Sequence, residues 1–191
     1  TGCGGSPSTI TVGTGTGTLT NTSYPAPYGN WYYGARHQIL FLASELQALG
    51  FSGGQITSLA FKVQLISGNS LYPDFTIKLG CTNLTSLSTF ESGLVTVFGP
   101  QNITISTGWN THTFSNGFDW DGTSNIIVEI CFYDPSGYTY NSSTYYTATS
   151  FPSVVWVNQD GNPGICTVNT SNGYSPNNTY RPNIQFNTCG G

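Results

Sequence analysis

The densest acidic cluster of this chain lies in the segment FDWDGTSNIIVEICF, residues 118–132. Asp119, Asp121 and Gly122 are spaced as in a calcium-binding loop, where oxygen ligands alternate along the chain before a glycine. When Gly122 is aligned with the glycine of an EF-hand loop, however, the first ligand position holds a glycine and the last a valine, and Glu129 misses the last position by one residue. The following segment also has the character of a strand rather than a helix. We therefore expect an Asp-Gly turn here; the alternative is a calcium site in which Asp119 and Asp121 are joined by ligands from elsewhere.

Residues for acid–base or nucleophilic catalysis are scarce. Glycoside hydrolysis needs two carboxylates on either side of the scissile bond, and no local pattern pairs any two of the eight Asp and Glu residues. The two histidines, His37 and His112, have no GxSxG motif to accompany them as part of a hydrolase triad. Both are more typical of hydrogen-bonded structural or surface histidines. We expect a protein without catalytic residues.

Aromatic side chains are abundant, at 14% of the chain. Sugar rings pack their apolar C–H faces on aromatic rings, while Asn, Gln and Thr hydrogen-bond to the hydroxyls. Trp31, Tyr32 and Tyr33 form the most concentrated group and are our candidates for binding surface glycans. Four more tyrosines lie in segments that resemble loops, namely Tyr138, Tyr140, Tyr145 and Tyr146. The alternative is that these rings only fill the core edge and the ends of the sheets.

Charge is almost absent, at 6% of residues where about a quarter is typical. The four Lys and Arg residues do not cluster, which argues against nucleic acid and anionic membrane surfaces as partners. No apolar run is long enough to span a bilayer, so we expect no membrane insertion. The chain opens with TGCGGSPST, without a signal peptide or an initiator Met, and we expect a processed product located outside the cell or on its surface.

The cysteines are consistent with an oxidising compartment. Five are present, and we expect disulfides among Cys3, Cys81, Cys131, Cys166 and Cys189. The sequence does not determine their pairing. Cys3 and Cys189 lie in matching glycine-flanked ends, so they either tie the two ends together or bond neighbouring subunits. Six segments fit the N-glycosylation sequon, at Asn21, Asn83, Asn102, Asn141, Asn169 and Asn177. They matter only if the source glycosylates that motif, and the alternative is that many arise by chance in a chain rich in Asn, Ser and Thr.

Short segments of alternating hydrophobicity, bounded by Gly, Pro or Asn, run through most of the chain. They predict strands at 55–65, 74–80, 93–99, 102–106, 108–115, 125–133, 153–157, 164–168 and 183–187. The segment 125–133 is the strongest and indicates a central strand. One short helix is expected within residues 37–50, capped by Ser44 and stopped by Gly50. The pattern predicts an all-β, two-sheet antiparallel β-sandwich, jelly-roll-like, in a single domain over residues 21–191.

Residues 1–20 form a separate case, since STITVGTGTGTLT alternates Thr with Gly or an aliphatic residue. Glycine within a strand either weakens it or permits another backbone to approach closely. One interpretation is a flexible arm or edge strand. The other is a donor strand that joins a neighbouring subunit's sheet. The residues assigned to this assembly arm are Thr9, Ile10, Thr11, Val12, Gly13, Thr14, Gly15 and Thr16.

Several segments together resemble a known module. They are YYGARHQILFLASELQALGFSGGQITSLAFKV (32–63), DFTIKLGCT (74–82), TVFGP (96–100), FDWDGTSNIIVEICF (118–132) and RPNIQF (181–186). In this order and spacing they are similar to a module of secreted and cell-surface, adhesin-like proteins of the Bacteroidetes, over about residues 28–187. The resemblance implies a β-sandwich exported across the outer membrane, often by the type IX route. The resemblance carries over no catalytic residues to this chain.

Taken together, these patterns predict a non-enzymatic extracellular protein with a structural or adhesive role. Our leading hypothesis is a fibre subunit that self-associates into a homopolymer through strand addition by the N-terminal arm. The alternative is a carbohydrate-binding module that uses Trp31, Tyr32 and Tyr33. No cofactor is expected, apart from the calcium alternative above.

Overall fold

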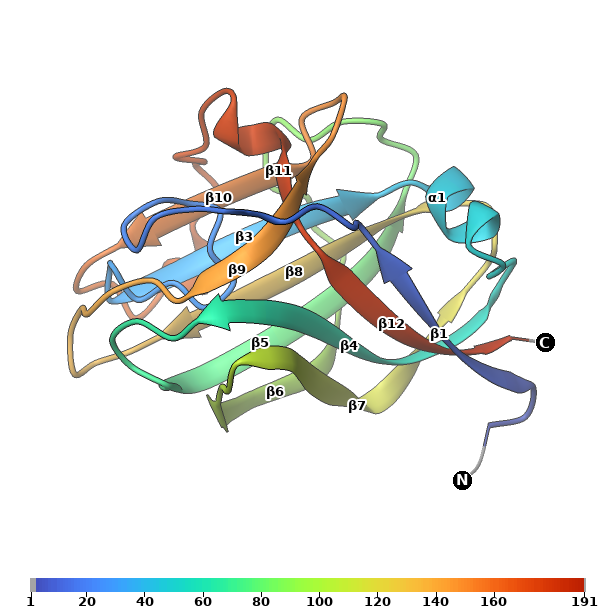
Figure 1. Ribbon diagram of the computed structural model, residues 1–191, viewed down its shortest axis with the longest axis horizontal. Coiled ribbons are helices and arrows are strands. Elements are labelled where there is room, and N and C mark those ends of the chain that lie inside the picture. The colour runs from blue at the N-terminus through green and yellow to red at the C-terminus, as the bar shows by residue number, and fades with distance from the viewer. Residues whose placement is uncertain (1–2, 191) are drawn as a thin grey trace.

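Two antiparallel β-sheets pack face to face in the computed structural model, which describes residues 3–190 (Figure 1). The strands are β1 Ser6–Val12, β2 Gly17–Thr18, β3 Gly34–Phe41, β4 Gly54–Leu65, β5 Leu71–Thr82, β6 Val95–Thr104, β7 Gly108–Trp120, β8 Asn125–Tyr133, β9 Ser143–Ala148, β10 Val154–Gln159, β11 Tyr180–Pro182 and β12 Ile184–Gly190. One α-helix, α1 Ala43–Ala48, and two 3-10 turns, η1 Ile165–Thr167 and η2 Asn177–Thr179, complete the described chain. The predicted antiparallel β-sandwich with one short helix is confirmed.

The first and last strands lie side by side. The seven-stranded sheet has the order β1-β12-β4-β9-β11, with β7 also paired to β4 and β2 to β9; the five-stranded sheet has the order β10-β3-β8-β5-β6. The register of β1 on β12 runs from Ser6 opposite Gly190 to Val12 opposite Ile184. The two ends of the described chain therefore meet at one corner of the sandwich (Figure 1).

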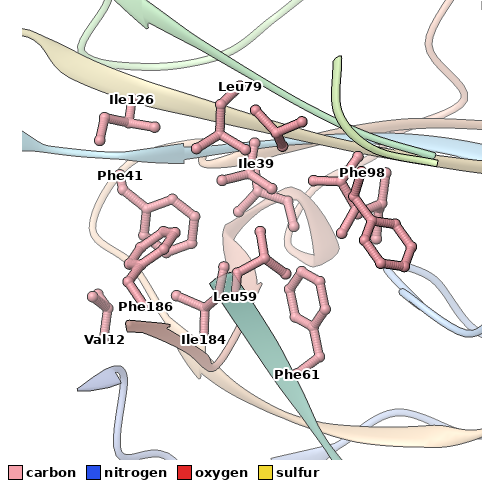
Figure 2. Packing of buried hydrophobic residues seen from close by; sticks show 14 of the residues in the cluster. Val12, Ile39, Phe41, Leu59, Phe61, Leu79, Phe98, Ile126, Ile184 and Phe186 are labelled. Carbon is pink, nitrogen blue, oxygen red and sulfur yellow. The ribbon is translucent and has the colours of Figure 1, made fainter. Parts of the chain in front are cut away.

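The main core lies between the sheets and is rich in aromatic rings. In Figure 2, Ile39 and Phe41 of the five-stranded sheet interdigitate with Leu59 and Phe186 of the seven-stranded sheet. The rings of Phe41 and Phe186 meet edge to face with centroids 5.5 Å apart, an arrangement that aromatic quadrupoles favour. These side chains are fully buried. The alternating hydrophobicity of the strands therefore places every second side chain in the core, as predicted from the sequence.

Strand β8 is buried on both faces, as expected of a central strand. Its side chains from Ile126 to Phe132 alternate between the main core and the outer side of the sheet, where Ile127 and Cys131 belong to two smaller clusters. Residues 83–94 and the turn η1 cover that outer side, where Leu87 packs on Ile127 and Ile165 packs near Cys131. The outer face over β8 is therefore covered by the protein's own chain.

Two predicted strand assignments need correction. Residues 164–168 do not form a strand, because Cys166 is bonded to Cys131 and Ile165 is fully buried over β8, which draws the chain into the turn η1. The segments 93–99 and 102–106 are not two strands but one, β6, which continues through Gly99 and Pro100 with shifts of register against β5.

The helix α1 begins at Ala43, two residues earlier than the predicted cap implies. Leu42 is the N-cap residue, and Ser44 lies inside the helix, so the capping role assigned to Ser44 is wrong. The Glu45 carboxylate accepts a hydrogen bond from the Leu42 N–H at 2.9 Å, half of a capping box. Gly50 follows the helix with φ +92°, a conformation that favours glycine and ends the helix as predicted. No helix within residues 3–190 is long and apolar enough to cross a membrane.

Candidate functional site

Five aromatic side chains meet at one end of the sandwich and line a pocket of about 260 Å³, which we call the aromatic pocket. They come from three separate parts of the chain and are Tyr24, Trp31, Tyr32, Trp156 and Tyr174. Trp156 and Tyr24 are buried and form its base, whereas Tyr174 is 54% exposed and stands against Trp156 at 5.6 Å between ring centroids. The rings open to a ligand are those of Tyr174 and of the partly buried Trp31 and Tyr32, which pack against this buried base.

Polar groups complete the lining of the aromatic pocket. Asn158 and Asn172 contribute amides, and Thr22 contributes a hydroxyl. The Asn172 side-chain N–H donates to the Asn158 side-chain oxygen at 3.1 Å, which fixes the orientation of both amides. Within residues 3–190 this leaves the Asn158 amide N–H and the Asn172 amide oxygen without a protein partner. One donor and one acceptor therefore remain beside the ring faces, the combination that a sugar hydroxyl requires.

Buried asparagines fix the loop that carries Trp31. The Trp31 backbone N–H donates to Asn141 Oδ1 at 2.9 Å, and Asn141 Nδ2 donates to the Ser23 carbonyl at 2.9 Å. Asn30 Nδ2 donates to the Tyr32 carbonyl at 3.0 Å. Asn141 is 1% exposed, so these bonds are shielded from water. The pocket is consequently preformed by the fold.

A second aromatic group adjoins the pocket and is named here the tyrosine platform: Tyr33, Tyr138 and Tyr140. Tyr140 stacks on Trp31 at 5.5 Å with an interplanar angle of 20°, and Tyr138 meets Trp31 edge-on at 5.8 Å. Tyr33 lies beyond, 6.4 Å from Tyr138. Tyr138 and Tyr140 are 59% and 47% exposed. Trp31 therefore belongs to both groups, and the aromatic surface is continuous.

Of the three predicted glycan-binding residues, Trp31 and Tyr32 line the pocket and Tyr33 lies in the platform. Pattern reasoning missed Tyr24, Trp156 and Tyr174, because Trp156 sits in an apolar strand pattern that indicates only a core. The segment NGYSPNN (172–178), with a tyrosine among turn residues, was the available signal for Tyr174. Of the four further tyrosines, Tyr145 and Tyr146 lie in strand β9 and not in a loop.

No charged side chain lines the aromatic pocket in the described part of the chain, but two carboxylates lie at this end of the sandwich. Asp160 accepts a hydrogen bond from the Tyr33 backbone N–H at 3.1 Å, and Asp134 accepts from the Ser136 N–H at 2.9 Å and from Asn69. Burial raises the pKa of Tyr24, so its hydroxyl stays protonated at any physiological pH. That hydroxyl donates to the Gly29 carbonyl.

The predicted assembly arm lies in the chain's own sheet. Thr9, Ile10, Thr11 and Val12 are part of β1, where Ile10 and Val12 are buried in the main core. Gly13, Thr14, Gly15 and Thr16 connect β1 to β2. In the single chain this segment is therefore an occupied edge strand rather than a spare arm.

The glycines of the arm permit close contact with β9 and with Asn183, which lies between β11 and β12. A Cβ atom on Gly13 would overlap Asn183, one on Gly15 would overlap the Tyr146 carbonyl oxygen, and one on Gly17 would overlap the Tyr146 ring. The Gly15 N–H donates to Thr147 Oγ1 at 2.8 Å. The close approach expected of these glycines is thus made to their own chain.

Four of the five cysteines form two disulfides, Cys3–Cys189 and Cys131–Cys166. The first joins the two ends of the described chain and the second holds η1 on β8. Cys81 has no sulfur partner among residues 3–190 and is exposed on β5. Partial burial and the nearby Asp121 carboxylate raise the pKa of its thiol, which lowers its reactivity.

The acidic pair Asp119 and Asp121 is not assembled into a metal centre in the described part of the chain. Asp121 accepts hydrogen bonds from the Thr123 and Ser124 N–H groups at 2.9 and 2.8 Å and from the Ser124 hydroxyl at 2.6 Å. These bonds lower the pKa of its carboxyl to about 2. Among residues 3–190 no group of three or more His, Cys, Asp or Glu side chains could hold an ion. The Asp-Gly turn is present, with Gly122 at φ +80°.

Both histidines are buried and make structural contacts. His37 Nε2 accepts a hydrogen bond from the Ala26 backbone N–H at 3.0 Å. His112 shares a 2.7 Å hydrogen bond with the Tyr28 hydroxyl and stacks on Phe75 at 5.2 Å. The residues that surround them are those of the core, as expected of structural histidines.

Arg36 and Glu129 form a buried ion pair on the outer side of the five-stranded sheet. Arg36 Nη2 lies 2.8 Å from Glu129 Oε1, which also accepts from Gln38 Nε2 at 2.9 Å. Arg36 Nη1 donates to the Val168 carbonyl at 2.8 Å. This network ties residues 168–169 to the sheet beside the Cys131–Cys166 bond.

Comparison with known proteins adds little to this description. No protein-family model matches the sequence, and no curated protein matches it. A solved structure titled "Structure of infectious bursal disease virus Gx strain" is similar at a TM-score of 0.29 and 11% identity, over 96% of this chain and 36% of that chain. A similarity at that level carries no argument. The resemblance to the Bacteroidetes module stays a prediction.

Proposed function

We propose that this protein is a non-enzymatic, extracellular adhesive module that binds saccharides at the aromatic pocket. The observation that carries the proposal is the convergence of Trp31, Tyr32, Trp156 and Tyr174 around two amides that keep one free donor and one free acceptor among the described residues. Ring faces take the apolar side of a sugar, and the amides take its hydroxyls. The two disulfides are consistent with the oxidising environment outside the cell.

Rigidity of the pocket supports a binding role. Weak ligands such as sugars lose affinity when a site must first be ordered, since each immobilised side chain costs about 0.5–1.5 kcal/mol. Here Asn141 and Asn30 hold the Trp31 loop in place before any ligand arrives. The lining of the pocket carries no charged side chain among the described residues, which also suits an uncharged ligand.

The test is a glycan array probed with the full chain and with variants. We expect Trp31→Ala and Tyr174→Ala to weaken binding about tenfold or more, since an aromatic contact contributes about 0.5–1.5 kcal/mol beyond its area. Trp109→Ala and Tyr145→Ala, outside the pocket, are matched controls that should bind like the wild type. Absence of any glycan signal from the intact protein would overturn the proposal.

A second candidate function is self-assembly into a fibre through β1. The observation that favours it is the position of β1 at the sheet edge, paired on one side with β12 and carrying no strand on its other side within residues 3–190. Exchange of β1 between copies would transfer Ile10 and Val12 into the neighbour's core. Cys3 would then lie beside Cys189 of the partner subunit.

Exchange of β1 would therefore link neighbouring subunits by a disulfide between Cys3 and Cys189. Exchanged subunits should migrate as a ladder in denaturing gels without reductant and collapse to monomers after reduction, and negative-stain microscopy should reveal filaments. Deletion of residues 1–20 should abolish them. Filaments from the deleted chain, or a full-length chain that stays monomeric at high concentration, would refute this candidate.

A further inference from the structure

We propose that the aromatic pocket and the tyrosine platform are two subsites of one site, which takes a neutral oligosaccharide of at least two rings. This inference rests on the proposed saccharide function and specifies its ligand. The two subsites are joined through Trp31, which lines the pocket and is covered on one face by Tyr140. A chain that leaves the pocket therefore passes directly over the platform.

The pocket accommodates about one sugar ring. Its volume of about 260 Å³ falls below the range of about 300–1,000 Å³ found for sites that enclose drug-sized ligands. A longer saccharide must therefore extend beyond Trp31 and Tyr174. On the side of Trp31, the next surface that it meets is aromatic.

The platform is exposed and yet held in one arrangement. Tyr138 and Tyr140 flank Thr139, whose backbone N–H donates to the Asn30 carbonyl at 2.7 Å and whose hydroxyl donates to Asn30 Oδ1 at 3.0 Å. The Asn69 N–H donates to the same hydroxyl at 3.1 Å. Half-exposed rings add little to a hydrophobic core, so their fixed, adjacent positions fit a surface on which a second ring stacks.

Charge determines the class of saccharide. No Lys or Arg lines either subsite in the described part of the chain, and the nearby carboxylates are Asp160 and Asp134. A uronic acid, sialic acid or sulfated sugar would bring a negative charge to a site with no cation to pair with it, and would face Asp160. The uncharged amides and hydroxyls instead match neutral hexose, pentose or N-acetylhexosamine units.

The experiment measures affinity against chain length by calorimetry or NMR titration on the full-length protein. The probes are cello-, xylo-, manno- and chito-oligosaccharides of increasing length from the monosaccharide, with oligogalacturonates as the anionic series. We expect one neutral series to gain about tenfold in affinity from one ring to three, and the anionic series to bind at least tenfold more weakly. Tyr140→Ala should abolish the gain with length, whereas Tyr174→Ala should weaken every length and keep the gain.

The outcomes separate this inference from the function on which it rests. Binding with no dependence on length, or a length dependence that survives both Tyr140→Ala and Tyr138→Ala, overturns the two-subsite arrangement but keeps a saccharide pocket. Tighter binding of oligogalacturonates overturns the neutral class. Absence of binding by every series overturns the proposed function and this inference with it. Tyr145→Ala, which replaces a tyrosine outside both subsites, controls for loss of an aromatic ring.

Discussion

Acidification should destabilise the fold through its two buried histidines. Desolvation by burial lowers the pKa of His37 to about 3 and of His112 to about 4. His37 Nε2 must be unprotonated to accept the Ala26 N–H, and His112 is enclosed by the rings of Tyr28, Phe75 and Phe98. Neither environment offers a counter-charge to an imidazolium, so protonation is incompatible with the native contacts.

The direction and size of the effect follow from linkage. Above about pH 6.5, both histidines are neutral in the folded and unfolded states and make no difference. As the pH falls below that value, the unfolded chain takes up protons that the folded chain does not. Each pH unit then removes about 1.4 kcal/mol per histidine until the folded pKa is reached. From neutral pH to pH 5 the loss is about 2 kcal/mol for each histidine and about 4 kcal/mol for both, a large part of the 5–15 kcal/mol or so that stabilises a typical domain.

Urea unfolding at pH 7, 6 and 5 measures this loss directly. The variants His37→Gln and His112→Gln keep a side chain of hydrogen-bonding capacity but cannot titrate. Each should reduce the difference in unfolding free energy between pH 7 and pH 5 by about 2 kcal/mol, whatever its own stability at pH 7. Because the comparison is between slopes, a general destabilisation by the substitution cancels.

The reasoning would be refuted by equal pH dependence in the wild type and in both variants. It would also be refuted if wild-type stability were unchanged between pH 7 and pH 5. A loss confined to pH values below about 4 would assign acid sensitivity to carboxylates with ordinary or lowered pKa values instead.

Two further predictions concern the packing of the chain. Gly15→Ala should destabilise the fold by about 1–3 kcal/mol, because the new methyl group overlaps the Tyr146 carbonyl oxygen. Gly4→Ala is the control, since a methyl group there meets no neighbouring atom and should leave the stability unchanged. Thermal melts of both variants give the comparison. Glu129→Gln leaves the buried guanidinium of Arg36 without its counter-charge and should lower the free energy of unfolding by about 3–5 kcal/mol. Urea unfolding measures this loss, and an unchanged midpoint concentration of urea would contradict the stabilising role of the pair.

Much of the fold could be predicted because it depends on local patterns. The alternation of residues 125–133 identifies a central strand, since only a strand places every second side chain in one core. The Asp-Gly turn at Asp121 and the helix stop at Gly50 follow from the chemistry of single residues. Where the prediction failed, at residues 164–168, a disulfide to Cys131 had overridden a local strand pattern.

The candidate site was predictable only in part, for a different reason. Trp31 and Tyr32 stand out as aromatic residues in a loop, but their partners Trp156 and Tyr174 come from distant parts of the chain. Only the strand order places β10 beside β3 and thereby brings Trp156 to the same end of the sandwich. Periodicity reports which face a side chain takes and carries no information on which strands become neighbours.

The bond between Cys3 and Cys189 has a mechanical consequence. It closes almost the whole described chain into a covalent ring, since the two cysteines have a sequence separation of 186, at a corner where β1 and β12 lie side by side. Tension applied from either side of the ring passes from one cysteine to the other through the bond, and the sandwich inside the ring carries none of it. Under load the protein should behave as a link of constant length. If that bond is reduced, the same force separates the adjoining ends of β1 and β12, and the hydrogen bonds between these strands break one after another, starting from the pair Ser6 and Gly190.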